Sequence, residues 1–219
     1  MKDFSFVSNT VIKRLPRYRR ILGDLSDKGV KVVSSTELSR IAGYTASQIR
    51  QDLNNFGAFG QQGYGYNVER LYRQIGMILG LQNEYKMIVL GAGNLGQAIA
   101  NYTRFYKSGY HIIAMFDVNP KLVGLRINDI EVLDAADLPA FLENNQVDIA
   151  VVTTDKDSAQ SVTDVLVGSC IRGVWNFTAA ELDVPEDMVV ENVHLSDSLH
   201  MLTYYLNQNS LKNKEQLSS

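Results

Sequence analysis

Hydrophobic positions near the start of the chain repeat with the period of an α-helix. The apolar side chains that share this face follow one another at intervals of four and three residues: Val11, Leu15, Tyr18, Leu22 and Leu25. Pro16 interrupts the pattern, so we expect it to kink this helix or to begin its main segment. Gly29 is expected to end the helix.

Two short helices are predicted next, each opened by a capping signal. Residues 34–37 read Ser-Ser-Thr-Glu, the spacing of a capping box, with an apolar pair at Leu38 and Ile41 and a stop at Gly43. Residues 45–48 repeat the device and open a helix that runs to about Asn55. Two capped helices joined by a tight, glycine-containing turn predict a helix-turn-helix.

The second of these helices has a polar face suited to reading DNA. In a helix-turn-helix it lies in the major groove with its N-terminal residues at the base edges. Arg and Gln have the geometry for bidentate contacts to guanine and adenine. The residues on this face are Ser47, Gln48, Arg50, Gln51 and Asn54. The residues expected to face the core are Ile49, Leu53 and Phe56.

Aromatic residues and glycines alternate from Phe56 to Tyr66, which predicts a β-hairpin, the wing of a winged helix. Gly63 and Gly65 allow close approach to a backbone, and Gly63 and Tyr64 are assigned to the DNA surface. A further amphipathic helix is expected from Val68 to Leu79, before Gly80.

The apolar run at 87–90 predicts a strand of a parallel sheet covered on both faces. A dinucleotide-binding fingerprint follows at once and opens a helix: Gly91, Ala92, Gly93, Asn94, Leu95 and Gly96. In this motif the first glycine allows a tight turn, the second lets the pyrophosphate approach the backbone, and the third lets helix and strand pack closely. Free N–H groups at the start of the helix favour phosphates.

A second apolar strand, residues 112–117, ends in Asp117, 21 residues beyond Gly96. A carboxylate at that position accepts hydrogen bonds from the adenosine ribose, and Val118 follows it in the site. The negative charge would repel a 2′-phosphate, which favours NAD(H) over NADP(H). The alternative is that Asp117 only serves the turn at the end of the strand.

Further βα units are expected to complete the sheet. They comprise helices over 136–142 and 158–169 and strands over 147–154 and 173–177. Thr153, Thr154 and Asn176 end strands on the same edge as the glycine loop. Ligands bind beyond the carboxyl ends of such strands, so these three residues are either cofactor contacts or helix caps.

The last predicted helix, from about Leu195 to Leu206, is apolar nearly all round. Such a helix requires burial on several sides, which favours insertion between subunits; packing within one chain is the alternative. Residues 209–219 are polar and are expected to form a disordered tail.

Charge separates the chain into two halves. Residues 1–80 carry twelve Lys and Arg against six Asp and Glu, whereas residues 81–219 carry nine against eighteen. A net charge of +6 suits a polyanion such as nucleic acid, and a net charge of −9 would repel one. No signal peptide or membrane span is evident, so a cytoplasmic protein without a membrane partner is expected.

Cysteine and histidine usage points away from disulfides and metals. Cys170 is the single cysteine, so it cannot form an internal disulfide, and we expect it to be a small buried residue of a helix. His111, His194 and His200 are scattered along the chain, and none has an evident carboxylate partner or a zinc spacing. No metal site is therefore predicted.

Over residues 5–208 the chain resembles the Rex family of bacterial redox-sensing transcriptional repressors. The resemblance rests on four segments: Leu15-Pro16-Arg17-Tyr18, Gln48-Ile49-Arg50-Gln51-Asp52-Leu53 with the Phe-Gly wing, the glycine fingerprint, and Asn176-Phe177-Thr178. It implies an α/β fold with a winged helix-turn-helix DNA-binding domain over 1–80 and a Rossmann-like NAD(H)-binding domain over 81–194. It also implies a homodimer that exchanges a C-terminal helix, residues 195–208. The implied partner is a pseudo-palindromic double-stranded operator, bound when NADH is low and released when NADH rises.

Site residues carry over from this resemblance one at a time. Arg50 and Gln51 take recognition-helix positions at which the family often has Arg followed by Lys. Tyr102 matches the family tyrosine near the nicotinamide, with His194 and Leu195 placed beside it at the start of the exchanged helix. The residues of the first helix assigned to DNA are Arg14, Arg17 and Arg20.

Two departures from the family pattern concern the nicotinamide side. Asn94 stands where some members have Arg, and His194 stands where some have Asp. A redox latch that links an Arg, the Tyr and that Asp therefore cannot be transferred whole, although Arg20 and Tyr102 remain.

Two other classes of protein share part of this pattern. One is an NAD-dependent oxidoreductase with an N-terminal interaction module; the other is a CoA- or nucleotide-binding regulatory subunit. Binding NAD is not catalysis, and the chain beyond the fingerprint is too short for a separate substrate domain. The regulatory subunit would lack the basic helix-turn-helix. The sequence therefore favours a repressor that is not an enzyme.

Overall fold

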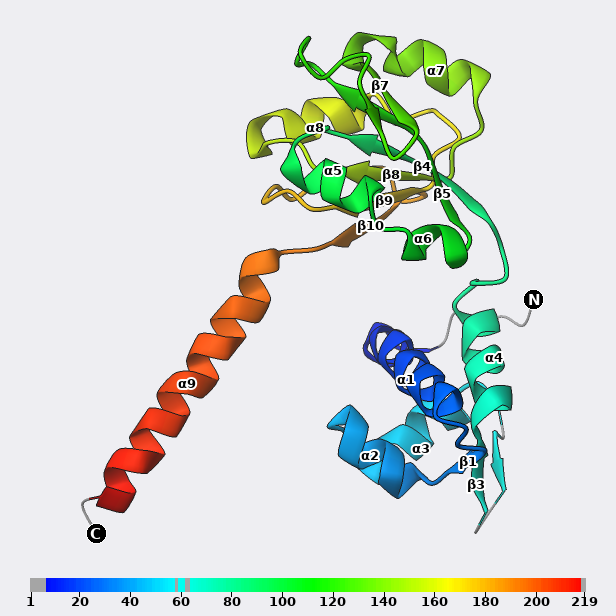
Figure 1. Ribbon diagram of the computed structural model, residues 1–219, viewed down its shortest axis with the longest axis vertical. Coiled ribbons are helices and arrows are strands. Elements are labelled where there is room, and N and C mark those ends of the chain that lie inside the picture. Colours follow the sequence, from blue (N-terminus) through cyan, green and yellow to red (C-terminus); the bar gives the residue numbers. More distant parts are fainter. Residues whose placement is uncertain (1–6, 58, 62–63, 218–219) are drawn as a thin grey trace. The chain divides into compact units, whose positions relative to one another are not determined.

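The computed structural model describes residues 7–57, 59–61 and 64–217. The chain divides into two compact units, Met1–Asn83 and Glu84–Ser219 (Figure 1), close to the boundary expected at residue 80. Gly63, assigned to the DNA surface, lies outside the described residues.

The first unit is a small helical domain with an antiparallel sheet in the order β1-β3-β2. Its elements are α1 (Asn9–Asp27), β1 (Val32–Val33), α2 (Ser35–Ala42), α3 (Ala46–Asn54), β2 (Gly60–Gln61), β3 (Gly65–Asn67) and α4 (Val68–Ile78). Strands β2 and β3 pair Gly60 with Tyr66, which confirms the wing. Gly65 has φ +81°, and a Cβ there would come within 2.6 Å of the Val33 carbonyl oxygen, so β3 approaches another backbone as expected.

Helix α1 forms where the hydrophobic period predicts it, and it packs against α2 and α4. Its buried face comprises Val11, Leu15, Tyr18, Ile21 and Leu22. Pro16 lies exposed within the helix, which begins before it at Asn9. Pro16 therefore does not begin the main segment.

The helix-turn-helix is capped as the sequence predicts. The Ser34 hydroxyl accepts from the Glu37 N–H at 3.1 Å, and Glu37 Oε2 accepts from the Ser34 N–H at 2.7 Å, a complete capping box. Gly43 ends α2 in the left-handed region, and the Thr45 hydroxyl accepts from the Gln48 N–H at the start of α3. Leu38 and Ile41 were expected to form the apolar pair of α2. Leu38 is buried, but Ile41 is exposed and Ala42 is buried in its place.

The second unit is a Rossmann-like domain around a sheet ordered β10-β9-β8-β4-β5-β7-β6 within the described residues. The strands are β4 (Tyr85–Leu90), β5 (Tyr110–Asp117), β6 (Arg126–Ile127), β7 (Ile130–Asp134), β8 (Ile149–Val152), β9 (Gly173–Asn176) and β10 (Val189–Asn192). The helices are α5 (Asn94–Ala100), α6 (Arg104–Lys107), η1 (Ala135–Asp137), α7 (Leu138–Asn144), α8 (Lys156–Asp164) and α9 (Leu195–Leu217). All neighbouring strands are parallel except the β6–β7 hairpin.

Successive side chains of β4 enter two separate cores, as expected for a sheet covered on both faces. Met87 and Val89 pack in one core with Ile99 of α5, and Ile88 and Leu90 pack in the other with residues of α7. The last four residues of β4, which lead into the glycine loop, are therefore buried on both faces of the sheet. The α/β fold class, winged helix followed by a Rossmann-like sheet, is confirmed.

Several elements differ from the sequence prediction. The β6–β7 hairpin, β10 and α6 were not predicted; the hairpin turns at Asn128 and Asp129, both with positive φ, and an Asn-Asp pair is a weaker turn signal than Asn-Gly. Helix α8 ends at Asp164, before Gly168 with φ +84°. Cys170 is exposed in a bend rather than buried in a helix.

The C-terminal helix is longer than predicted. It continues to Leu217, so the disordered tail expected over 209–219 is wrong as far as Leu217. Its apolar side chains between Leu195 and Leu206 are exposed, including Leu199, Leu202 and Tyr205.

Candidate functional site

The glycine loop between β4 and α5 has the backbone geometry of the fingerprint. Gly91 has φ +101°, and a Cβ there would lie 2.9 Å from the carbonyl carbon and oxygen of Thr153. A Cβ on Gly96 would overlap the Gly91 carbonyl oxygen. By contrast, a Cβ on Gly93 would meet nothing within 4 Å. The tight turn at Gly91 and the close packing at Gly96 agree with the prediction, and Gly93 borders open space.

Asp117 lies at the end of β5 and is bonded directly to the glycine loop. Its Oδ2 accepts from the Ala92 N–H at 2.6 Å and its Oδ1 accepts from the Asn119 N–H at 2.8 Å. Asp117 therefore also serves the strand-end turn that was the alternative interpretation. An ionised carboxylate has about four acceptor sites, so sites for ribose hydroxyls remain.

A cavity of about 320 Å³ lies at the carboxyl ends of β4, β5 and β8. Six of the predicted cofactor residues line it: Gly91, Gly93, Asp117, Val118, Thr153 and Thr154. Apolar residues not predicted from the sequence complete the wall: Leu90, Phe116, Ala135, Leu138, Val162 and Val165. The cavity thus combines a carboxylate, backbone and hydroxyl groups with an apolar wall, as ligand sites commonly do.

A second carboxylate in this cavity was also missed. Asp155 caps the N-terminus of α8, where its Oδ1 accepts from the Ser158 N–H at 2.9 Å. Hydrogen bonds from the backbone N–H and the hydroxyl of Ser158 hold the pKa of Asp155 below its usual value. The sequence signal was present, because Asp followed three residues later by Ser opens a predicted helix.

The two threonines that follow β8 make different hydrogen bonds. The Thr153 hydroxyl donates to the Gly91 carbonyl at 2.9 Å and so supports the glycine loop from β8. The Thr154 hydroxyl donates to the Asp155 carbonyl at 3.2 Å beside the cavity. Neither threonine accepts a backbone N–H as a helix cap does.

Asn176 is fully buried, and its side-chain amide is bonded within the protein, so its part in cofactor binding stays a prediction. Its Nδ2 donates to the Ala180 carbonyl and to Asn192 Oδ1, both at 2.8 Å. Its Oδ1 accepts from the N–H and the hydroxyl of Thr178. The amide therefore joins the end of β9 to β10 and to the following loop.

Tyr102 does not line the cavity of the glycine loop. It follows α5 and lines a separate cavity of about 300 Å³ with Tyr110 and Ile130, which begin β5 and β7. Helix α5 runs from the carboxyl edge of the sheet to the amino edge, so Tyr102 and Asp117 lie at opposite edges. Its expected place near the nicotinamide, apart from the glycine loop, stays a prediction.

His194 connects β10 to α9 and has a carboxylate neighbour that the sequence did not reveal. Its Nε2 lies 3.7 Å from Glu181 Oε1, and Asn192 Nδ2 donates to Glu181 Oε2 at 3.3 Å. His111 likewise has Glu84 at 3.8 Å. Both distances exceed a hydrogen bond suited to proton transfer. Leu195, the next residue, is exposed.

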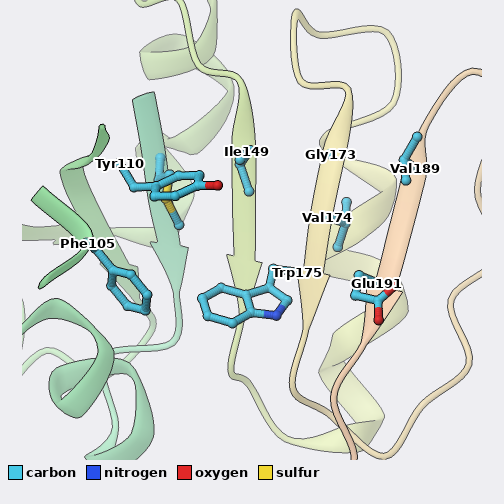
Figure 2. Close-up of a pocket in the computed structure, with 9 residues that line it drawn as sticks. Phe105, Tyr110, Ile149, Gly173, Val174, Trp175, Val189 and Glu191 are labelled. Atoms are coloured by element: carbon cyan, nitrogen blue, oxygen red, sulfur yellow. The ribbon is translucent and has the colours of Figure 1, made fainter. Parts of the chain in front are cut away.

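A further, mostly apolar cavity of about 420 Å³ lies over β4, β8, β9 and β10 (Figure 2). The rings of Phe105 and Trp175 border it with their centroids 5.6 Å apart, and Glu191 is its only carboxylate among the described residues. Trp175 also contacts Phe177, which directly follows β9, with a centroid distance of 4.6 Å. An aromatic row thus reaches the carboxyl edge of the sheet.

The outer face of α3 presents the polar side chains predicted to read DNA. Ser47, Arg50, Gln51 and Asn54 are exposed and border a shallow hollow, while Gln48 is half-buried. Arg50 Nη1 donates to the Ser35 hydroxyl at 2.8 Å, which holds the guanidinium against the start of α2. On the wing, Tyr64 is 80% exposed.

The arginines of α1 divide into two groups. Arg20 is exposed, as is Arg17, whose guanidinium lies 5.4 Å from the centre of the Tyr44 ring. The side chain of Arg14 is only 12% exposed and forms a bidentate ion pair with Asp52. Arg14 is therefore a partner of the recognition helix, and its assignment as a DNA contact is disfavoured because the side chain is largely buried and two of its three guanidinium nitrogens are engaged.

In the described part of the chain, none of the helices is both long and apolar enough to cross a membrane. No group of three His, Cys, Asp or Glu side chains in the same part of the chain comes together as a metal site.

A winged helix-turn-helix followed by a Rossmann-like domain with a nucleotide-sized cavity defines a class of protein, the nucleotide-responsive DNA-binding regulator. Two family models match the chain: a putative DNA-binding protein N-terminus over residues 6–54 and a CoA binding domain over 82–180. The redox-sensing transcriptional repressor Rex of Caldanaerobacter subterraneus subsp. tengcongensis is 55% identical over 98% of this chain and 96% of that protein. The chain belongs to the Rex family of redox-sensing transcriptional repressors.

Solved structures agree with this membership. The structure of RSP in complex with beta-NAD+ and operator DNA has a TM-score of 0.87 and 54% identity, covering 96% of this chain and 97% of that one. The structure of RSP in complex with beta-NADH has a TM-score of 0.89 and 52% identity, covering 95% and 98%.

Proposed function

We propose that this protein is a transcriptional repressor that binds an operator and is released from it by NADH, so that it responds to the NADH/NAD+ ratio. The observation that carries the proposal is the presence of two sites in one chain: the exposed polar face of α3, and the cavity formed by the glycine loop and Asp117. The named relatives are redox-sensing repressors, and the RSP complexes contain NADH, NAD+ and operator DNA.

The adenosine half of NAD(H) is assigned to the described cavity. Asp117 accepts from the ribose hydroxyls, and the apolar wall formed by Leu138, Val162 and Val165 faces the adenine. Gly93, with open space at its Cα, admits the pyrophosphate. Ala92, Asn94, Leu95 and Gly96 shape the loop, and Ala92 holds Asp117 through its N–H.

The two redox forms differ at the nicotinamide, by a hydride and a positive charge. The adenine half cannot distinguish them, so the sensing contacts must lie elsewhere. A ligand shifts an equilibrium only through its different affinities for the two states. We place the contacts that sense the redox form near His194 and Leu195, at the start of α9, with Glu181 beside His194. Tyr102 would contribute to sensing across the dimer, because it does not line the glycine-loop cavity of its own chain.

The domain assignment follows from these sites. Residues 1–80 bind DNA, residues 81–194 bind NAD(H), and α9 forms the dimer contact by exchange between two chains. Exposed leucines and tyrosines on α9 support this exchange, since an apolar helix surface of that extent requires a partner. Two copies of α3 would then read the two halves of a pseudo-palindromic operator. A bacterial repressor of this kind works in the cytoplasm.

The two alternatives remain testable by the same experiment. The match to a CoA binding domain makes CoA the relevant competitor, and NADH consumption would indicate an oxidoreductase. We expect the full chain to retard a palindromic duplex selected from a random pool, and NADH to reverse this. NAD+ and CoA should not reverse it, and the NADH should be recovered unchanged. DNA binding that ignores NADH, or that responds to CoA alone, would overturn the proposal.

A further inference from the structure

The inner face of the recognition helix carries a buried charge. Asp52 lies on α3 between Ile49 and Leu53, and its side chain is 3% exposed. A carboxylate removed from water is strongly unfavourable unless it is paired and hydrogen-bonded. Asp52 therefore depends on its neighbours in α1.

Two residues of α1 satisfy this carboxylate with three short hydrogen bonds. Arg14 donates from Nε to Oδ2 and from Nη2 to Oδ1, each at 2.6 Å. The Tyr18 hydroxyl donates to Oδ2 at 2.7 Å. Because Arg14 and Tyr18 are four residues apart, they project from one face of α1. Helix α1 thus holds α3 at a single residue through a rigid fork.

The same stretch of α1 also contacts the turn of the helix-turn-helix. Tyr44 lies between α2 and α3, and its ring centroid is 5.8 Å from that of Tyr18. The guanidinium of Arg14 lies 5.7 Å from the centre of the Tyr44 ring. Burial and the hydrogen bond to Asp52 raise the pKa of Tyr18, and the bond to Asp52 raises that of Arg14. Both donors therefore keep their protons across the physiological range.

The position of Asp52 on the helix relates it to the residues that face DNA. Successive helical residues are about 100° apart, so residues two positions away lie on nearly opposite faces. Arg50 and Asn54 are each two positions from Asp52 and are exposed. Fixing Asp52 therefore fixes the rotation of α3 about its own axis, and with it the direction in which Arg50 and Asn54 point.

We propose that Arg14, Tyr18 and Asp52 form a positioning cluster that sets the rotation of the recognition helix for base readout. A buried ion pair is a weak means of gaining stability, but it can specify one arrangement among several. Bidentate contacts to base edges tolerate little misalignment, so a small rotation of α3 lowers discrimination between sequences. The cluster does not contact DNA. The inference rests on the proposed function as a DNA-binding repressor.

The first test removes one hydroxyl. In Tyr18→Phe we expect affinity for the selected operator duplex to fall about three- to tenfold, while affinity for an unrelated duplex changes less than about twofold. The slope of affinity against salt concentration should stay constant, because the phosphate contacts are unchanged. The matched control is Tyr72→Phe on α4, whose ring packs against Arg19 of α1 at 4.3 Å and which should leave both affinities unchanged.

The second test separates positioning from stability. The triple variant Arg14→Leu/Tyr18→Phe/Asp52→Leu replaces the whole buried cluster by apolar side chains and leaves no member without its partner, a change that often preserves or raises stability. We expect a thermal midpoint near that of the wild type together with loss of most of the operator preference. Arg14→Lys keeps the positive charge but loses the bidentate contact. Its preference for operator over unrelated duplex should lie between that of the wild type and that of the variant without the cluster.

Each outcome decides one question. A stable triple variant that retains its operator preference refutes the positioning role, as does a Tyr18→Phe variant that weakens binding to operator and unrelated duplex equally. If the triple variant fails to fold, the ratio of operator affinity to unrelated-duplex affinity in Tyr18→Phe and Arg14→Lys still tests the positioning role: an unchanged ratio in both variants refutes it. Failure of the wild-type chain to select any sequence from a random pool would refute the proposed function instead.

Discussion

The Ala92 N–H donates to Asp117 Oδ2 at 2.6 Å, so the carboxylate expected to bind the ribose also holds the glycine loop. The end of β5 and the loop after β4 are therefore joined by a contact within the protein itself. Asp117 therefore has two roles, binding the ribose and holding the glycine loop, and different substitutions can separate them.

Asp117→Asn keeps an acceptor for the Ala92 N–H but removes the negative charge. We expect weaker NADH binding and less discrimination against NADPH, because the carboxylate both bonds the ribose and repels a 2′-phosphate. Asp117→Ala should lose more affinity, since the loop contact goes as well. Fluorescence titration with both nucleotides measures this; unaltered curves would remove Asp117 from the site.

Two glycines of the fingerprint should fail in different ways. Gly96→Ala places a Cβ onto the Gly91 carbonyl, so it should lower the thermal midpoint and abolish NADH binding. Gly93→Ala meets no protein atom within 4 Å, so the midpoint should stay near the wild-type value while NADH binding weakens. If Gly93→Ala binds NADH normally, the pyrophosphate does not pass there.

Arg50→Ala should weaken operator binding by about 1–3 kcal/mol if the guanidinium reads a base edge. NADH affinity serves as the control and should be unchanged. Ser35→Ala, which removes the hydroxyl that holds Arg50, should have a smaller effect in the same direction. An equal loss on operator and random duplex would make Arg50 a phosphate contact.

Removal of α9 by truncation before Leu195 should abolish the dimer and two-fold operator recognition. The exposed leucines of this helix are its contact surface in the proposed exchange, and two recognition helices are needed for a palindrome. Sedimentation checks the assembly. A truncated chain that still sediments as a dimer would place the interface elsewhere.

The capping box of α2 makes a prediction about acid pH. Hydrogen bonds from the N–H and the hydroxyl of Ser34 lower the pKa of Glu37 from its ordinary value of 4.5. A lowered folded-state pKa means that the stabilisation is present above the unfolded pKa and is lost as pH falls through the folded value. Glu37→Gln should therefore be less stable than the wild type at neutral pH and converge with it in acid. Urea unfolding at several pH values measures this difference, and a constant gap would exclude the carboxylate as its source.

Local patterns predicted the elements whose signals lie within a few residues. The Ser34–Glu37 capping box, the left-handed Gly43 and the glycine loop all depend on neighbours in sequence, and all have the expected geometry. The partnership of Arg14 with Asp52 joins positions 38 residues apart, and nothing in either segment indicates it. An arginine on a helix beside other arginines reads as a DNA contact until its partner is known.

Two candidate site residues have surroundings that the sequence did not predict. Asn176 and Tyr102 were assigned by their position relative to strands and motifs, without knowledge of where each side chain is used. The side-chain amide of Asn176 is hydrogen-bonded to Asn192 and Thr178. Tyr102 lies at the amino edge of the sheet because α5 carries the chain from the carboxyl edge across to it. Predicting strand order does not predict which polar atoms the fold itself requires.

Trp175 is the only tryptophan of the chain, and it stands next to Phe177 at the strand end that borders the nucleotide edge. Tryptophan emits light at wavelengths that reduced nicotinamide absorbs and oxidised nicotinamide does not. Resonance energy transfer acts across the width of a domain, so bound NADH should quench this emission and bound NAD+ should leave it nearly intact. The intrinsic fluorescence of the unlabelled protein should therefore report whether NADH or NAD+ is bound.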